Sequence, residues 1–260
     1  MKRNQTLPEH RRQQLLQQIK ESGVVKTSDL AKDYHVSQMT IRNDLRVLAL
    51  QGHLDRIHGG AIAQRWLSKE PSYQEKANLN RQEKQAIGRE AALLIEEGMA
   101  IFIGNGTTTM EIIRNLPSDR NIQIFTNSLN HATALASIPN VEVIVVGGSL
   151  RGISYAMVGK LGHRMLKGVY FDLTFFGVNG LSIDRGLTLP SLEEAEMAAE
   201  VICNSQRTVI VADHTKFGVV AHGKIADVSD IDVVITDEEP SLDFTQAIAS
   251  SDTILRTILL

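Results

Sequence analysis

A short stretch near the amino end, from Ser37 to Leu50, combines side chains that can read DNA with a helical repeat of apolar residues. Arginine and asparagine can form paired hydrogen bonds with guanine and adenine edges, and threonine can contact a phosphate or a thymine methyl group. If Ser37 caps a helix here, the apolar residues share one face, which comprises Ile41, Leu45 and Leu48. The pattern predicts a helix with one side for packing and one for DNA, although a solvated surface helix would carry similar charges.

The polar residues on the other side of this predicted helix fall into two groups according to the part of DNA that they can bind. The candidates for contacts with base edges are Gln38, Arg42 and Asn43, and those for phosphates are Ser37, Thr40 and Arg46. Asp44 lies in the same run, but phosphates repel a carboxylate. We therefore expect Asp44 to pair with a neighbouring cation or to cap the backbone.

A second stretch, Gly104-Asn-Gly-Thr-Thr-Thr109, has the composition of an anion-binding turn. It follows an apolar run and precedes the helical pattern MEIIRNL, so its N–H groups and hydroxyls would lie at a helix start. It lacks the Gly-Lys-Ser/Thr ending of a Walker A loop, and Thr109 breaks the GxGxxG pattern. A tight turn without a ligand would look the same, so both interpretations stay open.

Three more loops of small residues follow apolar runs: Thr126–Ser128, Gly147–Arg151 and Gly177–Gly180. In a parallel sheet, such loops meet at the carboxyl edge of the strands, where ligands bind. Four loops of this kind favour a pocket at that edge, to which Asn127 and Gly148 would contribute.

The elements that must position the DNA-reading residues are predicted within residues 1–62. Pro8 suits the start of a first helix, Thr27 can cap a second, and the third ends near Gly52. The short connection between the second and third helices indicates a helix-turn-helix unit. The following HLDRIHGGAIAQR alternates around Gly59-Gly60, which predicts a small hairpin, or wing.

The remaining chain has a different pattern. Residues 63–80 lack clear periodicity and contain Pro71, which indicates a linker. From Arg81 a helical pattern leads into short runs rich in Val, Ile and Phe, several of them separated by helix-length segments. These runs are MAIFIGNG, IQIFTNS, VEVIVVGGS, LTFFGVNG, RTVIVAD and IDVVITD. They predict an α/β domain with a parallel sheet over residues 81–260.

Charge is distributed unevenly along the 260 residues, whose net charge is -3. Residues 1–65 carry 11 Lys/Arg and 6 Asp/Glu, a net of +5, so the remainder carries 16 and 24, a net of -8. A basic head on an acidic body suggests that the head meets a polyanion.

The sequence argues against several classes of protein. It has no apolar run long enough to span a membrane and no secretory signal, and its single cysteine, Cys203, fits a reducing cytoplasm and a buried role. No histidine or cysteine cluster has zinc spacing, and no Gly-x-Ser-x-Gly elbow is present. We therefore predict a cytoplasmic protein with no metal and no cofactor.

The head resembles a known family. The run Thr40-Ile-Arg-Asn-Asp-Leu45, together with Arg11, Leu15, Ile19 and Ser37, is similar to the helix-turn-helix signature of the DeoR family of bacterial transcriptional regulators. Arg56-Ile-His-Gly-Gly-Ala61 resembles that family's wing. Arg56 and His58 could therefore reach the DNA backbone or minor groove, and His58 could equally be a turn residue.

Residues 81–260 resemble the sensor domain of the same family, which is similar to ribose-5-phosphate isomerase. The matching runs are Phe171-Asp-Leu173 with FFGVNG, Gly186-Leu-Thr188, Glu194-Ala195 and Asp213-His-Thr-Lys-Phe217. The resemblance implies a phosphate site made by Gly106, Thr107, Thr108, Thr109 and Lys216, with Arg151 as a further cation and sugar-hydroxyl contacts from Asp172 and Glu194. Two positions depart from the family pattern: Gly104-Asn105-Gly106 replaces Asp-Ser-Gly, and Ala198 stands where a lysine is common.

The resemblance implies a repressor of a carbohydrate-utilisation operon that binds operator DNA and leaves it when a phosphorylated sugar enters the α/β domain. Helix-turn-helix proteins usually pair on two half-sites, so we expect a homo-oligomer built through residues 81–260. The alternative is a sugar-phosphate isomerase with an appended DNA-binding head. That alternative needs a base and a cation beside the substrate, and the sequence shows no complete set, so we predict that the chain is not an enzyme.

Overall fold

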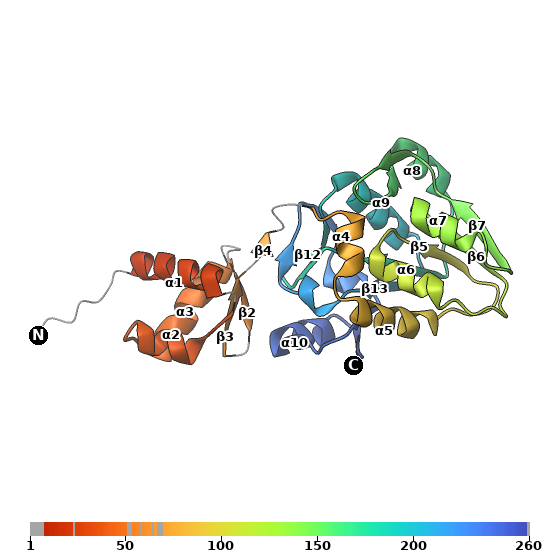
Figure 1. The fold of residues 1–260 in the computed structure, drawn as a ribbon. Helices are drawn as coiled ribbons and strands as arrows, with labels where there is room; N and C mark the ends of the chain where they lie inside the picture. The colour runs from red at the N-terminus through yellow and green to blue at the C-terminus, as the bar shows by residue number, and fades with distance from the viewer. Residues whose placement is uncertain are drawn as a thin grey trace, which may run out of the picture.

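The computed structural model describes residues 8–22, 24–50, 54–57, 59–63, 65–66 and 70–258 (Figure 1). The head contains three helices and a three-stranded antiparallel sheet with the strand order β1-β3-β2. Their bounds are α1 Pro8–Ser22, β1 Val24–Lys26, α2 Thr27–Asp33, α3 Gln38–Leu50, β2 Leu54–Ile57 and β3 Gly60–Ala63. Gly59 has a φ of 78° at the tip between β2 and β3, a conformation that favours glycine. The predicted helix-turn-helix and wing are confirmed, and β1 is a strand that the sequence did not predict.

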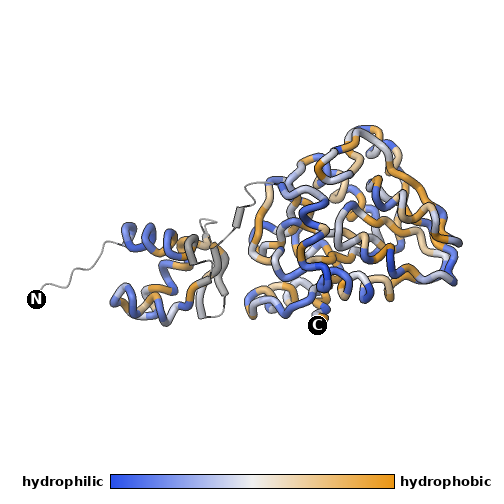
Figure 2. The backbone as a smooth tube through the Cα atoms, viewed as in Figure 1, coloured by the Kyte–Doolittle hydropathy of each residue, from blue (hydrophilic) through white to orange (hydrophobic). Residues whose placement is uncertain are grey.

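Apolar side chains from all three helices and the wing form the core of the head. Figure 2 shows hydrophobic and hydrophilic positions interleaved along the helices of the head. Fully or almost fully buried are Leu15, Ile19, Leu30, Ile41, Leu45, Leu48, Leu54 and Ala61. The three α3 residues among them have the spacing that was predicted for its packing side. The opposite side of α3 is therefore left for solvent or a ligand.

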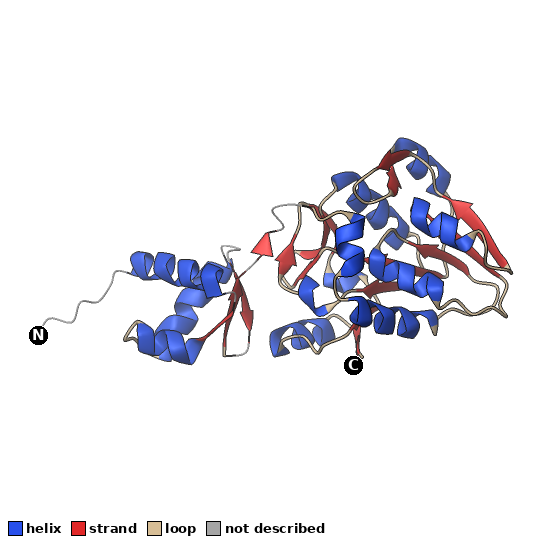
Figure 3. Cartoon of the chain, in the orientation of Figure 1, coloured by secondary structure: helices blue, strands red, loops and turns tan. Residues whose placement is uncertain are grey.

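The body is built on a seven-stranded parallel sheet with the order β17-β16-β13-β10-β5-β6-β7. Figure 3 shows the strands of the body surrounded by helices. The bounds are β5 Ala100–Ile103, β6 Ile122–Thr126, β7 Val141–Val145, β10 Leu173–Gly177, β13 Thr208–Val211, β16 Val233–Thr236 and β17 Ile254–Thr257. Six of these strands lie in the six apolar runs of the sequence, so the predicted parallel α/β domain is confirmed. The edge strand β17 was not predicted.

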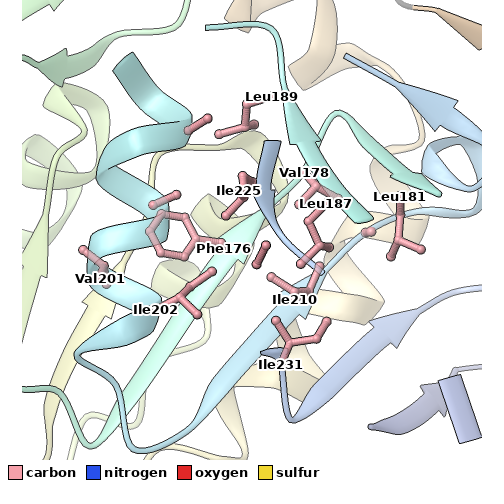
Figure 4. Close-up of a cluster of buried hydrophobic side chains, with 14 of the residues drawn as sticks. Phe176, Val178, Leu181, Leu187, Leu189, Val201, Ile202, Ile210, Ile225 and Ile231 are labelled. Carbon is pink, nitrogen blue, oxygen red and sulfur yellow. The ribbon is translucent and has the colours of Figure 1, made fainter. Parts of the chain in front are cut away.

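Helices cover both faces of the sheet, and alternate strand residues feed two cores. One core receives Ile101 and Ile103 and is covered by α5 Arg81–Ala92, α6 Thr107–Arg114 and α7 Leu129–Leu135. The other receives Phe102 and is covered by α8 Lys160–Leu166, α9 Leu192–Cys203 and α10 Leu242–Ser250. Figure 4 shows this second core, where Phe176 and Ile210 meet residues of α9. Burial on both faces explains why the strands read as continuous apolar runs.

Several smaller elements surround the sheet. A second, three-stranded sheet has the order β11-β12-β15, and β8 and β9 form an antiparallel pair. The bounds are β8 Ser149–Arg151, β9 Ala156–Val158, β11 Gly180–Ser182, β12 Gly186–Leu189, β15 Gly223–Ala226, and the short helices η1 His214–Lys216 and η2 Val228–Asp230. None of these elements was predicted from the sequence.

The segment between head and body contains regular structure. β4 Arg65–Trp66 pairs in parallel with β14 Val219–Val220 of the body. The helix α4 Tyr73–Asn78 starts with a capping box, in which Ser72 and Glu75 bond each other's backbone N–H groups. The stretch that lacked periodicity is thus attached to the body over part of its length.

Two further observations concern the whole chain. Cys203 is exposed at the end of α9, so the expectation that it is buried was wrong. Within the part of the chain that the structure describes, no helix has the length and apolar character needed to cross a membrane.

Candidate functional site

The open side of α3 carries the polar residues that the sequence singled out. Gln38, Arg42, Asn43 and Arg46 are exposed, and Thr40 is half-buried. Ser37 caps the helix, since its Oγ accepts the Thr40 N–H at 3.1 Å. The Thr40 hydroxyl lies 2.8 Å from the same Oγ, so the Thr40 hydroxyl and the Ser37 hydroxyl also form a hydrogen bond with each other. The arrangement presents amide and guanidinium groups together, as a helix that enters a major groove requires.

Asp44 lies on the buried side of this helix rather than on the open one. Its carboxylate accepts the Arg11 Nε at 2.6 Å and the Arg12 Nε at 3.1 Å. The Asp44 and Arg11 side chains are 5% and 10% exposed, so the pair is largely out of water. The prediction that Asp44 pairs with a cation is confirmed, and the pair joins α1 to α3.

Two wing candidates are less completely placed. Arg56 lies in β2, opposite Ala61 of β3, and its side chain is outside the described residues. His58 lies outside the described residues altogether. Both stay predictions.

A cavity of about 330 Å³ opens at the carboxyl edge of the large sheet. The predicted anion-binding loop forms part of its lining through Asn105, Gly106, Thr107 and Thr108. Residues from other segments also line it, among them Lys76, Asn80, Lys84, Gly177, Val178, Asn179, Leu189, Glu194, Asp213 and Lys216. Residues that follow β5, β10 and β13 thus meet in one cavity, as expected for the carboxyl ends of parallel strands.

The loop leads directly into a helix start with unsatisfied donors. α6 begins at Thr107, its N-cap is Gly106, and no side chain caps it. The first N–H groups of a helix have no partner within the helix, so those of residues 107–109 are available for an anion. A Cβ on Gly106 would lie 2.7 Å from the Thr109 Oγ1, which explains the glycine. The Thr109 hydroxyl is buried and without a hydrogen-bond partner among the described residues.

His131 supports the loop from behind. It is fully buried on α7, and its Nε2 lies 3.0 Å from the Gly106 carbonyl oxygen, to which it can donate. Burial lowers the pKa of His131 to about 4, although bonds to the Gly106 and Ile103 backbone act in the opposite direction. The ring is therefore neutral near pH 7, and it fixes the residue that caps α6.

This burial predicts a pH dependence of stability. The pKa in the folded chain is about 4, below the ordinary 6.5, so the contribution of the neutral ring is fully present above pH 6.5 and is lost as the pH falls towards 4. The loss amounts to about 3 kcal/mol of unfolding free energy. Urea unfolding from pH 7 to 4 should show a smaller fall for His131→Gln than for the wild type. The exposed His222→Gln should follow the wild type, and parallel curves for His131→Gln would contradict the assignment.

Lys216 and two further lysines bring positive charge to the cavity. The Lys216 Nζ lies 3.8 Å from the Asp213 Oδ2, so the two side chains form an ion pair. Burial opposes the ionisation of Asp213, but Lys216, Thr215, Lys84 and Asn80 outweigh it and lower its pKa. Burial also lowers the pKa of Lys84, whose ammonium donates to the Leu79 carbonyl at 2.7 Å.

Glu194 lines the cavity within a network of bonds to other side chains. Its Oε1 accepts from Arg151 and from the Ser154 hydroxyl, the latter at 2.7 Å, and its Oε2 accepts the Asn105 Nδ2 at 3.2 Å. Arg151 in turn donates to Glu70 at 2.8 Å, and these carboxylates raise the pKa of the guanidinium. Arg151 therefore binds Glu194 and does not line the cavity itself.

The other predicted effector residues have different positions. Asn127 accepts the Asn105 N–H at 3.1 Å and so supports the loop. Gly148 is exposed and is not part of the lining. Asp172 precedes β10 and accepts the Ala100 N–H at the start of β5, at the amino edge of the sheet. The prediction that Asp172 bonds the effector is corrected, because the cavity opens at the opposite edge.

The two departures from the family pattern have structural consequences. A Cβ on Gly104 would lie 2.2 Å from the Phe176 ring, so the position of that ring excludes a side chain at residue 104. Ala198 is fully buried in the core against the sheet. Unlike the lysine that is common at this position in the family, it cannot provide a positive charge for Glu194. Arg151 supplies the cation instead.

Sequence reasoning missed Lys76, Lys84 and Asn80 as cavity residues, and His131 as support. The first three lie in or next to the segment 63–80, which was predicted to be a linker. His131 lies on a helix for which the sequence did not predict the buried side. The Ser72–Glu75 capping box was a readable sign that the segment is helical.

One group could offer ligands to a cation. Atoms of His214, Asp237 and Glu238 lie within 4.8 Å of one another. The His214 Nδ1 is 2.6 Å from the Asp237 Oδ2. Burial lowers the pKa of His214, but the hydrogen bond and charge of Asp237 prevail and raise it. A hydrogen-bonded pair accounts for this geometry without a metal.

Comparison with known families matches both parts of the chain. Residues 11–65 match the model described as the DeoR-like helix-turn-helix domain. Residues 79–238 match the model described as the DeoR C terminal sensor domain.

Individual relatives agree with these matches. A putative aga operon transcriptional repressor from Escherichia coli O157:H7 is 35% identical over 88% of this chain and 86% of its own. The glycerol-3-phosphate regulon repressor of Escherichia coli K12 is 31% identical over 90% of this chain and 92% of its own. Among solved structures, ribose 5-phosphate isomerase A from Methanocaldococcus jannaschii has 18% identity and a TM-score of 0.40 over 53% of this chain and 55% of that one. That likeness supports no inference about a ligand or a reaction.

Proposed function

We propose that this chain, which belongs to the DeoR family of transcriptional regulators, represses a carbohydrate-utilisation operon and leaves its operator when a phosphorylated sugar binds the cavity. The observation that carries the proposal is the division of α3, whose apolar side is buried while Arg42 and Asn43 lie exposed. Both relatives described above are named as repressors.

The cavity supports a phosphorylated ligand by its chemistry. Uncapped N–H groups at the start of α6 and the ammonium of Lys216 suit a phosphate. Asn105 Oδ1 and Asp213 Oδ2 are buried acceptors without a hydrogen-bond donor among the described residues. Sugar hydroxyls would donate to them. A ligand that carries both a phosphate and hydroxyl groups therefore fits this lining.

The geometry favours a regulator over the alternative enzyme. Proton transfer would need a base beside the substrate carbon. Asp172 lies at the other edge of the sheet, and Glu194 is engaged by three side-chain donors. Neither of these two carboxylates is therefore placed in the cavity with an oxygen free of hydrogen bonds, as a catalytic base would need.

Control of DNA binding then follows from linkage. A sugar phosphate weakens operator binding if it prefers an arrangement of the chain whose heads fit the DNA poorly. We propose residues 1–62 as the DNA-binding domain, 63–80 as the connection and 81–260 as the domain that senses the effector and joins copies of the chain. Two copies would place two heads on two half-sites.

The test of DNA reading is Arg42→Ala. If Arg42 makes a bidentate contact with a base edge, its loss should weaken binding of the preferred duplex by ~1–3 kcal/mol and relax the choice of base at one position. Selection of duplexes from a random pool, followed by anisotropy titrations, measures both effects. Arg164→Ala, an exposed change on α8, is the matched control and should leave affinity and base preference intact.

Two outcomes would revise the assignment. An equal loss on every duplex would make Arg42 a phosphate contact, because phosphates carry no sequence information. Unchanged binding and preference would remove the open side of α3 from the interface and with it the main support for the proposal.

A further inference from the structure

The segment that joins head and body also forms a wall of the cavity. β3 ends at Ala63 and α4 begins at Tyr73, so nine residues, 64–72, separate the wing from this helix. Four residues of the segment line the cavity: Pro71, Lys76, Leu79 and Asn80. Figure 1 shows α4 beside α6, the helix whose first residues line the same cavity. A ligand at the start of α6 therefore lies against the connection to the DNA-binding head.

Both ends of this segment are bonded to polar residues of the cavity. At the amino end, Arg151 joins Glu70 to Glu194. At the carboxyl end, the Asn80 Nδ2 donates to the Asp213 Oδ1 at 3.1 Å. Glu194 and Asp213 are the two carboxylates of the lining. A ligand that bonds either carboxylate therefore acts on a group that also holds the segment.

Between these ends, α4 rests on the body through contacts that do not involve the lining carboxylates. The Tyr73 N–H donates to the Ile153 carbonyl at 2.8 Å, and the Gln74 Nε2 donates to the Tyr155 hydroxyl at 2.7 Å. The Lys84 ammonium donates to the carbonyls of Lys76 and Leu79, where α4 ends. Helix α4 is thus attached to the body by a defined set of hydrogen bonds, and a ligand in the cavity can strengthen or weaken this attachment.

Lys76 is the residue of α4 best suited to sense an anion. Its side chain is half-buried in the lining, and among the described residues it forms no ion pair. Burial lowers the pKa of this ammonium, and the charges of Glu194 and Glu70 offset part of that effect. A desolvated cation without a close partner gains from a phosphate in the same cavity.

We propose that Lys76 is an effector ligand and that segment 70–80 transmits the presence of the effector to the head. This inference rests on the proposed function, because it needs an anion at the start of α6. The anion attracts the Lys76 ammonium and so holds α4 against the body. The effector therefore favours the state of the chain in which α4 is packed on the body. The operator favours the state in which segment 70–80 is less restrained.

The experiment is hydrogen exchange of the full chain with inorganic phosphate as the probe. In the wild type, phosphate should slow exchange at residues 107–109 and also at residues 73–79. Lys76→Met should lose the effect at 73–79 and bind phosphate at least tenfold more weakly, while Lys76→Arg, which keeps the charge, should retain both. Lys167→Met, an exposed change outside the cavity, is the matched control and should equal the wild type.

The outcomes separate this inference from the proposed function. Protection at 107–109 without any change at 73–79, or wild-type behaviour of Lys76→Met, overturns the inference and leaves the anion site standing. Protection at neither segment removes the anion site itself and, with it, the effector response in the proposed function. Unchanged exchange of the large sheet in each variant shows that the variant is folded.

Discussion

Replacing Asp44 with Ala should unfold the head while the body stays intact. The substitution removes the carboxylate that both Arg11, whose side chain is 10% exposed, and Arg12 bond. Removal of one partner from a buried ion pair costs about 3–5 kcal/mol, because the remaining charge is still out of water. The head is small, and the core among its described residues consists of short apolar contributions from three helices and the wing, so it has little stability to spare. Operator binding should therefore be lost, although Asp44 itself does not face the DNA.

Hydrogen exchange of the full chain separates this effect from a direct loss of DNA contacts. Amide protection in α1 and α3 should fall by roughly two to three orders of magnitude in Asp44→Ala, and that of the large sheet should not change. Asp33→Ala, an exposed carboxylate on α2, is the control and should stay near the wild type. Protection of α1 and α3 within about fivefold of the wild type would show that the pair is not needed for the fold.

Replacing Thr107 with Glu should abolish the response to the effector and spare DNA binding. The new carboxylate would lie at the first residue of α6, where unpaired N–H groups and the helix dipole attract negative charge. It would occupy the donors that a phosphate needs and repel the phosphate itself. We expect the affinity for a phosphorylated sugar to fall at least about 100-fold, roughly 2.8 kcal/mol.

Calorimetric or thermal-shift titration with a panel of sugar phosphates measures this loss, since a bound ligand raises apparent stability. Thr133→Glu places the same charge at an exposed position of α7 away from the cavity and serves as the control. The helix itself should not suffer, because a carboxylate in a first turn is favourable. An unchanged affinity in Thr107→Glu would remove this loop from the effector site.

The elements that could be predicted from the sequence are those with a strong local pattern of apolar and polar residues. The sheet strands buried on both faces were found because strands such as 208–211 are continuous apolar runs. The edge strand 254–257 was missed because it mixes Ile254 with Arg256 and is partly exposed. Asp44 was assigned correctly because electrostatics alone excludes a carboxylate from a phosphate surface.

The errors in the cavity have equally specific causes. Asp172 precedes its strand, and a residue before a parallel strand lies at the edge opposite the carboxyl-end loops, so topology could have excluded it. Lys76 and Asn80 reach the cavity from a segment with no apolar period, and their role depends on how that segment folds back on the body. Contacts of that kind are set by tertiary structure, which no local pattern reports.

The most direct test of the account is the occupancy of a duplex selected by the wild-type chain, followed by anisotropy as sugar phosphates are added. The chain should bind this duplex specifically at roughly 10⁻⁸ M or tighter at physiological salt. Its affinity for the duplex should fall at least tenfold with one of the phosphorylated sugars and should not change with the corresponding free sugar. A chain that selects no duplex even at low salt, or that holds its duplex in the presence of every sugar phosphate, would contradict the proposed function.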